Sequence, residues 1–99
     1  MQVTKTVKET RDLIKNWKRE GKTIGLVPTM GFLHEGHASL IKRCREENDI
    51  VVVSDFVNPT QFGPTEDLEA YPRDFKRDSE LCESLGADVI FHPEPKDMY

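Results

Sequence analysis

Residues 27–37 read Val-Pro-Thr-Met-Gly-Phe-Leu-His-Glu-Gly-His, between a predicted strand and a predicted helix. A helix N-terminus presents unpaired N–H groups and the positive end of the helix dipole, which suit a phosphate group. Gly31 and Gly36 let the backbone approach that phosphate closely. His34 and His37 can donate hydrogen bonds to its oxygens, where negative charge builds up. The stretch therefore predicts nucleotidyl transfer, in which a substrate attacks the α-phosphorus of ATP.

Strand and helix patterns alternate on both sides of this stretch. A capping box at Thr6-Val7-Lys8-Glu9 predicts a helix that Gly21 ends, and Pro28 is expected to end the first strand. A loop rich in Pro, Gly and Asn is expected over 57–72. The remaining elements are predicted as strand 23–27, helix 37–47, strand 50–56, helix 73–85 and strand 88–92.

Alternating strands and helices indicate right-handed crossovers and a parallel sheet. The predicted fold class is α/β, a Rossmann-like three-layer arrangement of which three parallel strands form the first half. Ligands of such sheets bind beyond the carboxyl ends of the strands, so the loops at 28–37 and 58–63 should meet at one crevice. We expect residues 1–99 to be the N-terminal portion of such a domain, with an open sheet edge and uncovered apolar surface.

The composition indicates a cytoplasmic, water-soluble protein. The 99 residues are 32% charged with a net charge of −4, and Lys and Arg are scattered among Asp and Glu, so no nucleic-acid partner is expected. No signal peptide or membrane span is recognisable, and no membrane partner is expected. Cys44 and Cys82 read as small buried apolar residues. An ATP site on this acidic chain must collect positive charge locally, from the helix N-terminus, the histidines and Mg²⁺.

Three motifs in order resemble the N-terminal part of the pantothenate synthetase (pantoate–β-alanine ligase) family. Residues 27–37 resemble its ATP loop, with the His-x-Gly-His element that other nucleotidyltransferases share. Residues 56–62, Phe-Val-Asn-Pro-Thr-Gln-Phe, resemble its pantoate loop, and residues 66–73 resemble the segment that follows. The resemblance implies an AMP-forming ligase of pantothenate biosynthesis. It would join pantoate and β-alanine through a pantoyl adenylate and release pyrophosphate and AMP, as a homodimer when complete.

The resemblance also assigns roles to particular residues. His34 and His37 would contact the phosphates of ATP, with His37 as the proton donor to the leaving group. Gln61 would hold pantoate and lie near β-alanine, and Asn58 would support that loop. Mg²⁺ would bridge the phosphates, with no metal site built by the protein itself. The residues lining ATP would be Met30, Gly31, Phe32, Leu33, His34, Glu35, Gly36 and His37, and Met30 would also contact pantoate.

Alternatives remain open for these residues and for the chain. His34 and His37 could instead cap the helix as an i, i+3 pair, and Gln61 could be a solvated loop residue. His92 and Trp17 read as structural residues. The chain could also be another His-x-Gly-His nucleotidyltransferase, or a non-catalytic piece that associates through its open edge. Without the remaining phosphate contacts, we expect little activity from these 99 residues alone.

Asp55 departs from the family pattern, because an apolar residue, commonly isoleucine, usually stands there. A carboxylate buried at the end of a central strand without a partner would cost several kcal/mol or take up a proton. We expect Asp55 to face solvent, where covering neighbours are missing.

Overall fold

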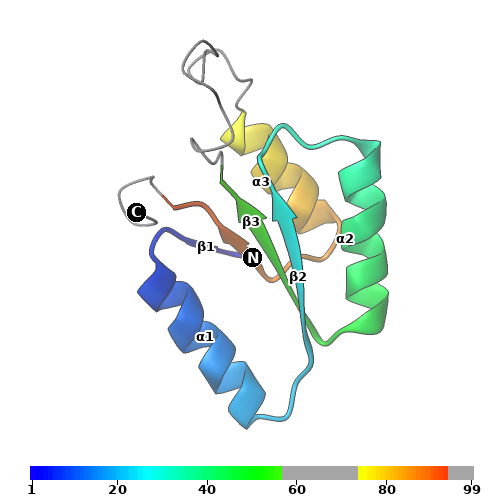
Figure 1. The fold of residues 1–99 in the computed structure, drawn as a ribbon. Coiled ribbons are helices and arrows are strands. Elements are labelled where there is room, and N and C mark those ends of the chain that lie inside the picture. Colours follow the sequence, from blue (N-terminus) through cyan, green and yellow to red (C-terminus); the bar gives the residue numbers. More distant parts are fainter. Residues whose placement is uncertain (57–73, 94–99) are drawn as a thin grey trace, which may run out of the picture.

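Strands and helices alternate along the chain and build one parallel sheet (Figure 1). The computed structural model describes residues 1–56 and 74–93. Within these ranges the strands lie in the order β1-β4-β3-β2, and each neighbouring pair is parallel. The elements are β1 (Gln2–Thr4), α1 (Val7–Arg19), β2 (Ile24–Thr29), α2 (Glu35–Glu47), β3 (Ile50–Asp55), α3 (Phe75–Ser84) and β4 (Val89–Phe91).

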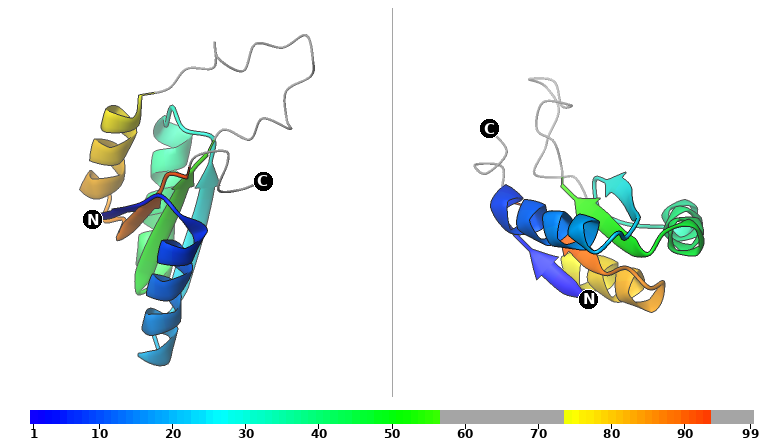
Figure 2. Two further views of the ribbon diagram at one scale, coloured as in Figure 1. Left: turned by 90° about the vertical axis from the view of Figure 1, so that its left-hand side faces the viewer. Right: turned by 90° about the horizontal axis from the view of Figure 1, so that it is seen from below.

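Helices cover both faces of the sheet, which confirms the predicted three-layer α/β fold (Figure 2). On one face, residues of α2 and α3, among them Ile41 and Cys82, pack on the buried side chains of Val51, Val53 and Ile90. On the other face, α1 packs Leu13, Ile14 and Trp17 against Ile50, Val52 and Val89. β3 is apolar on both faces because it is covered twice, as is typical of a parallel sheet. Trp17 is thus a structural residue, as predicted.

Thr6, the first residue of the predicted capping box, is the N-cap of α1. The Thr6 side chain accepts a hydrogen bond from the Glu9 amide at 3.1 Å, and the Thr6 hydroxyl donates to Glu9 Oε1 at 3.1 Å. These bonds satisfy one of the free amides of the first turn and fix the Glu9 side chain over the cap.

Two details of the strands differ from the sequence prediction. β2 continues through Pro28 to Thr29, because β2 is an edge strand and a proline without an N–H group can sit where no further strand needs that donor. β1 was not expected, because three residues of which only Thr4 is buried carry no strand pattern. β1 forms because it pairs in parallel with β4, with Gln2 beside Val89 and Thr4 beside Phe91.

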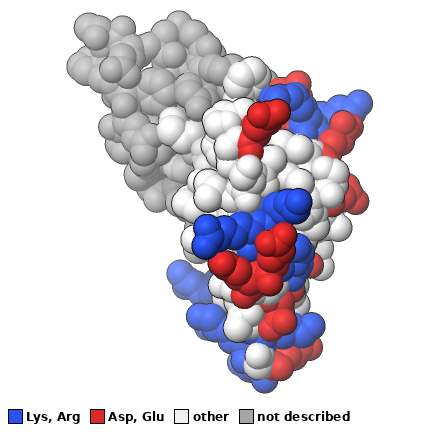
Figure 3. All heavy atoms as spheres, turned by 90° about the vertical axis from the view of Figure 1, so that its right-hand side faces the viewer, with Lys and Arg blue, Asp and Glu red and all other residues white. Residues whose placement is uncertain are grey.

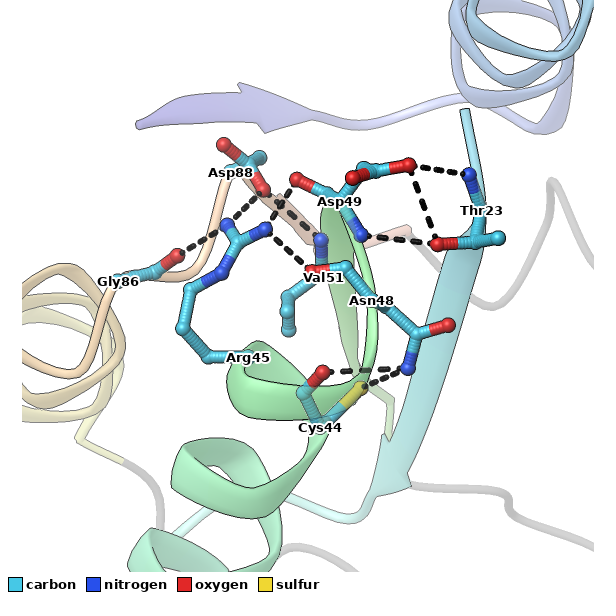
Figure 4. Close-up of polar contacts among 8 residues, drawn as sticks. All are labelled: Thr23, Cys44, Arg45, Asn48, Asp49, Val51, Gly86 and Asp88. Carbon is cyan, nitrogen blue, oxygen red and sulfur yellow. Dashed lines mark hydrogen bonds and ion pairs between the residues drawn. The ribbon is translucent and has the colours of Figure 1, made fainter. Parts of the chain in front are cut away.

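A polar network around Arg45 joins the elements at the amino ends of the strands (Figure 4). The guanidinium donates to Asp88 Oδ2 at 2.7 Å, to the Gly86 carbonyl at 3.1 Å and to the Asn48 carbonyl at 2.7 Å, and it also contacts the Asp49 carbonyl. The Asp88 carboxylate in turn accepts the Val51 amide at 2.8 Å. Arg45 thus ties the end of α2 to the start of β3 and to the turn before β4.

One face of the molecule carries charges of both signs. On the side that carries α2, Lys and Arg lie among Asp and Glu, and no broad area of one sign is visible among the described residues there (Figure 3). At the β2 edge, Leu26 is 63% exposed.

Within residues 1–56 and 74–93, no helix combines the length and the apolar character needed to cross a bilayer.

Candidate nucleotide site

The predicted ATP loop lies beyond the carboxyl end of β2, beside the end of β3. Thr29 pairs with Asp55 in the register of these two strands. The Thr29 hydroxyl donates to the Ser54 carbonyl at 2.9 Å and accepts the Gly31 amide at 3.1 Å. One side chain therefore turns the chain away from the sheet and anchors that turn to β3.

The turn itself needs glycine at position 31. Gly31 has φ +83°, a conformation that L side chains rarely adopt, and Phe32 follows with φ +50°. A Cβ on Gly31 would also lie 2.5 Å from Asp55 Oδ1 and 3.4 Å from Asp78 Oδ2. The sequence analysis expected the missing side chain of Gly31 to make space for a phosphate. In the structure, the carboxyl groups of Asp55 and Asp78 occupy that space. Phe32 is a non-glycine residue held in a sparsely populated conformation at a candidate site.

Asp78 of α3 holds this loop. Its Oδ2 accepts the Phe32 amide at 2.8 Å, and its Oδ1 accepts the Leu33 amide at 2.8 Å. The preceding residue on the helix, Arg77, donates to the Leu33 carbonyl at 2.8 Å, and its guanidinium lies 5.1 Å from the centre of the Phe32 ring. Asp78 is 1% exposed, so its carboxylate is buried with its hydrogen bonds made to the loop backbone.

Asp55 is buried beside Asp78, so the prediction that Asp55 faces solvent is wrong. Asp55 is 4% exposed, because α3 lies over the end of β3 on the face that Val51 and Val53 share. The two carboxyl groups lie together behind Gly31, because a Cβ on that glycine would stand 2.5 Å from Asp55 Oδ1 and 3.4 Å from Asp78 Oδ2. Burial first, and then the negative charge of Asp78, raise the pKa of Asp55 to about 6, while His92 acts in the opposite direction. His92 also lies close, with its Nδ1 3.0 Å from the Asp55 carbonyl oxygen and its ring stacked on Phe75.

His34 and His37 cap α2, which is the alternative that the sequence left open. His34 Nδ1 accepts the Gly36 amide at 3.0 Å, and His37 Nδ1 accepts the His34 amide at 3.2 Å. The two ring centres are 4.2 Å apart. A nitrogen that accepts carries no proton, so each neutral ring holds its proton on Nε2. Burial, and secondarily His34, lower the pKa of His37, which favours this neutral form, although Asp78 acts to raise it.

Capping leaves donors at this helix N-terminus. The His37 amide belongs to the cap, because the His34 side chain accepts from it. Among the described residues, nothing accepts from the Nε2 of either histidine or from the Glu35 amide. A Cβ on Gly36 would lie 2.8 Å from His34 Cε1, so glycine at this position gives the capping ring its room. Three donors of one helix start are thus available to an anion.

The other residues predicted to line ATP differ in how exposed their side chains are. Phe32 is 46% exposed, whereas Leu33 is fully buried in the core and its amide is already bound to Asp78, so its side chain cannot line a ligand. Met30 is half-buried beside the turn, and Glu35 is exposed in the first turn of α2. Gln61 and Asn58 lie outside the described residues.

Asp78 and Arg77 shape the loop and were missed by the sequence reasoning. A signal for Asp78 existed, because it lies three residues after Phe75 and four before Cys82, within the apolar stripe of the helix. A carboxylate in such a stripe needs a buried partner. For Asp55 the signal was its position in the strand. Side chains alternate between the two faces of a strand, so Asp55 lies on the same face as Val51 and Val53.

The described residues build no metal site of their own. No group of three or more His, Cys, Asp or Glu side chains within residues 1–56 and 74–93 is arranged to hold an ion. A Mg²⁺ ion at this loop would therefore depend on oxygens that a nucleotide supplies.

A parallel sheet covered on both faces, with a turn leading from a strand end into a capped helix, defines an α/β protein with a nucleotidyltransferase-like fold. Residues 2–99 match the pantoate-beta-alanine ligase family, and the chain therefore belongs to this family. It is 59% identical over 99 residues to the pantothenate synthetase of Clostridium acetobutylicum, and 63% identical over 94 residues to that of Bacillus licheniformis. The aligned region covers 100% of the chain in the first case and 95% in the second, but only 35% and 33% of those relatives.

Solved structures show the same fold. Pantothenate synthetase from Thermus thermophilus matches with a TM-score of 0.90 at 46% identity, over 100% of this chain and 34% of that one. The ligase from Francisella tularensis, complexed with beta-gamma ATP and beta-alanine, matches with a TM-score of 0.90 at 45% identity, over 100% of this chain and 38% of that one. The chain thus spans about a third of the length of the relatives it matches.

Proposed function

We propose that this chain provides the ATP- and pantoate-binding part of an AMP-forming pantoate–β-alanine ligase of the cytoplasm. The family membership supports the reaction, and the Francisella relative was solved with an ATP compound and beta-alanine. The observation that carries the proposal is the start of α2, where two imidazole Nε2–H groups and the Glu35 amide are available as donors.

The reaction has two steps in this proposal. A pantoate carboxylate oxygen attacks the α-phosphorus of ATP, the bond from that phosphorus to the bridging oxygen breaks, and pyrophosphate leaves. The amine of β-alanine then attacks the acyl carbon of the adenylate and displaces AMP. Donors at the start of α2 stabilise the charge that develops on the phosphates, and His37 Nε2–H is the donor assigned to the leaving group.

Pantoate would lie across from the nucleotide, held by Gln61, Asn58 and Met30, with β-alanine also near Gln61. Gln61 and Asn58 lie outside the described residues, so this part of the proposal depends on the sequence motif. Mg²⁺ would accompany ATP and offset the charge of its phosphates, and no step needs a protein cage for the ion. The complete enzyme is proposed to be a homodimer.

An exchange assay tests the proposal. Pantoate should stimulate the incorporation of labelled pyrophosphate into ATP when the chain and Mg²⁺ are present, and omission of pantoate should abolish this exchange. Stimulation by another acceptor with pantoate inactive would assign the site to a different nucleotidyltransferase. We expect overall turnover far below that of a full-length relative, because the chain spans 35% of such a relative. Turnover equal to a full-length enzyme would contradict that expectation.

A further inference from the structure

Two buried carboxyl groups lie directly behind the candidate ATP loop and have no part in the reaction described above. Asp55 ends β3 and Asp78 lies in the first turn of α3, 23 positions later in the sequence. They are 4% and 1% exposed. Two negative charges in contact inside a protein repel each other strongly, so one proton is expected between them.

The hydrogen bonds decide which group carries that proton. Both oxygens of Asp78 accept backbone amides, from Phe32 and from Leu33 at 2.8 Å each. Both oxygens of Asp78 are thus already used as acceptors, which leaves Asp55 as the donor of the pair. Asp55 Oδ1 and Asp78 Oδ2 lie beside the same point behind Gly31, so a protonated Asp55 is placed to donate to the Asp78 carboxylate.

We propose that Asp55 and Asp78 act as a proton-sharing pair that positions the loop at Phe32 and Leu33 for nucleotide binding and makes this positioning depend on pH. The effect on nucleotide binding rests on the function proposed above, whereas the positioning of the loop does not. Both residues are positioning residues, because they act through the loop backbone.

The pair responds to pH in one direction. When Asp55 is protonated, its hydrogen bond to Asp78 leaves one negative charge behind the loop and keeps Asp78 in place for the two amides. When Asp55 loses its proton, two buried charges repel, the bond to Asp78 is lost, and a second negative charge lies near the site of an anionic ligand. Loop order and ATP affinity should both fall as pH rises.

Other titratable and charged groups face the pair from the surrounding elements. They are His92 after β4, Arg77 and Cys82 on α3, and His37 on α2. Burial, with Asp78 and Asp55 adding to it, raises the pKa of Cys82 to about 12, so this thiol does not change state near neutral pH. Imidazole groups can change charge between pH 5 and 8, so a variant of Asp55 itself must separate its effect from those of His92 and His37.

Nuclear magnetic resonance of the isotope-labelled 99-residue chain tests the positioning without any ligand. The carboxyl carbon of Asp55 should titrate with a midpoint near the pKa of about 6, and the amide signals of Phe32 and Leu33 should shift with the same midpoint. In Asp55→Asn, whose amide group always donates to Asp78, these amide shifts should no longer follow that midpoint. Asp12→Asn, the same change on exposed α1, should leave the titration as in the wild type.

Two results would overturn the positioning: loop amides that do not titrate with Asp55, or amide shifts in Asp55→Asn that still follow the wild-type curve. The wild-type titration alone decides the first of these, even if a variant fails to fold. Asp78→Glu provides a second variant, since it keeps the charge but moves the carboxylate, and it should displace both amide signals.

Calorimetry with Mg-ATP at pH 5.5 and 7.5 tests the link to the nucleotide. From pH 5.5 to pH 7.5, the affinity for Mg-ATP should fall about fivefold more in the wild type and in Asp12→Asn than in Asp55→Asn. The protonation of ATP itself affects all three proteins equally, so it cancels in this comparison. Equal pH dependence in Asp55→Asn and wild type would refute the link. Absence of ATP binding to the wild type at both pH values would refute the proposed function together with this link, while the ligand-free titration still decides the positioning.

Discussion

The carboxylate of Asp78 accepts the amide of Leu33 at 2.8 Å, across 45 positions of sequence. This bond joins α3 to the loop between β2 and α2, two parts of the chain that no short-range pattern connects. Leu33 is fully buried, so the amide has no water to replace its partner. The loop is therefore held from behind by α3, while its helix end stays open to a ligand.

Asp78→Ala should destabilise the chain by about 2–4 kcal/mol, because it leaves the Phe32 and Leu33 amides without their acceptor. Urea unfolding followed by circular dichroism measures this change. Asp12→Ala, on the exposed surface of α1, is the matched control and should change the free energy of unfolding by about 0.5 kcal/mol or less. An Asp78→Ala variant as stable as this control would show that the loop does not depend on the carboxylate.

Asp55→Asn should stabilise the chain at pH 7 by about 1–3 kcal/mol, because it removes a buried charge that repels Asp78. The folded pKa of about 6 lies above the ordinary value of 3.8, so the folded state holds this proton more tightly than the unfolded state. The contribution of Asp55 is therefore fully present below about pH 4 and is lost as pH rises through 6. Urea midpoints between pH 4 and 8 should show this loss in the wild type and a flatter curve in the variant.

Arg45→Ala should cost about 1–3 kcal/mol, since it breaks the ion pair with Asp88 and the bonds to Gly86 and Asn48 at once. Arg45→Lys should recover little of this, because an ammonium cannot reproduce the guanidinium fork. The control is Arg43→Ala, whose pair with Glu47 lies on the exposed face of the same helix and should contribute about 0.5 kcal/mol or less. Equal losses for Arg45 and Arg43 would contradict a structural role for the network.

His34→Asn should separate helix capping from ligand binding. Asparagine is a good N-cap, so the stability should stay within about 0.5 kcal/mol of wild type, but the Nε2–H donor is lost and Mg-ATP affinity should fall. His34→Ala should lose both, with about 1 kcal/mol of stability removed. Thermal unfolding and calorimetry on the same samples measure the two effects. Unchanged affinity in His34→Asn would mean that the ring only caps the helix.

Local signals predicted most of the fold. The Thr6–Glu9 capping box and the Val-rich run of β3 identified their elements, because capping and burial act within a few residues. The strand through Pro28 and the added β1 could not be read locally, because both depend on which edge of the sheet is free.

The candidate site was predicted less completely. The glycines and histidines of residues 31–37 marked the loop, but the partners behind it come from α3, and a long-range pairing such as that of Asp55 with Asp78 leaves no spacing in the sequence. Asp55 was therefore expected at the surface, although the alternation of side chains along β3 places it on the covered face of that strand.

The most direct test of the central claim is an amide titration of the labelled chain with Mg-ATP, followed by pantoate. We predict that Mg-ATP shifts the signals of residues 31–39, with the largest changes at Glu35 and His37, and that pantoate then shifts Gln61. A well-dispersed spectrum that neither ligand changes would contradict the claim that these residues form a nucleotide site.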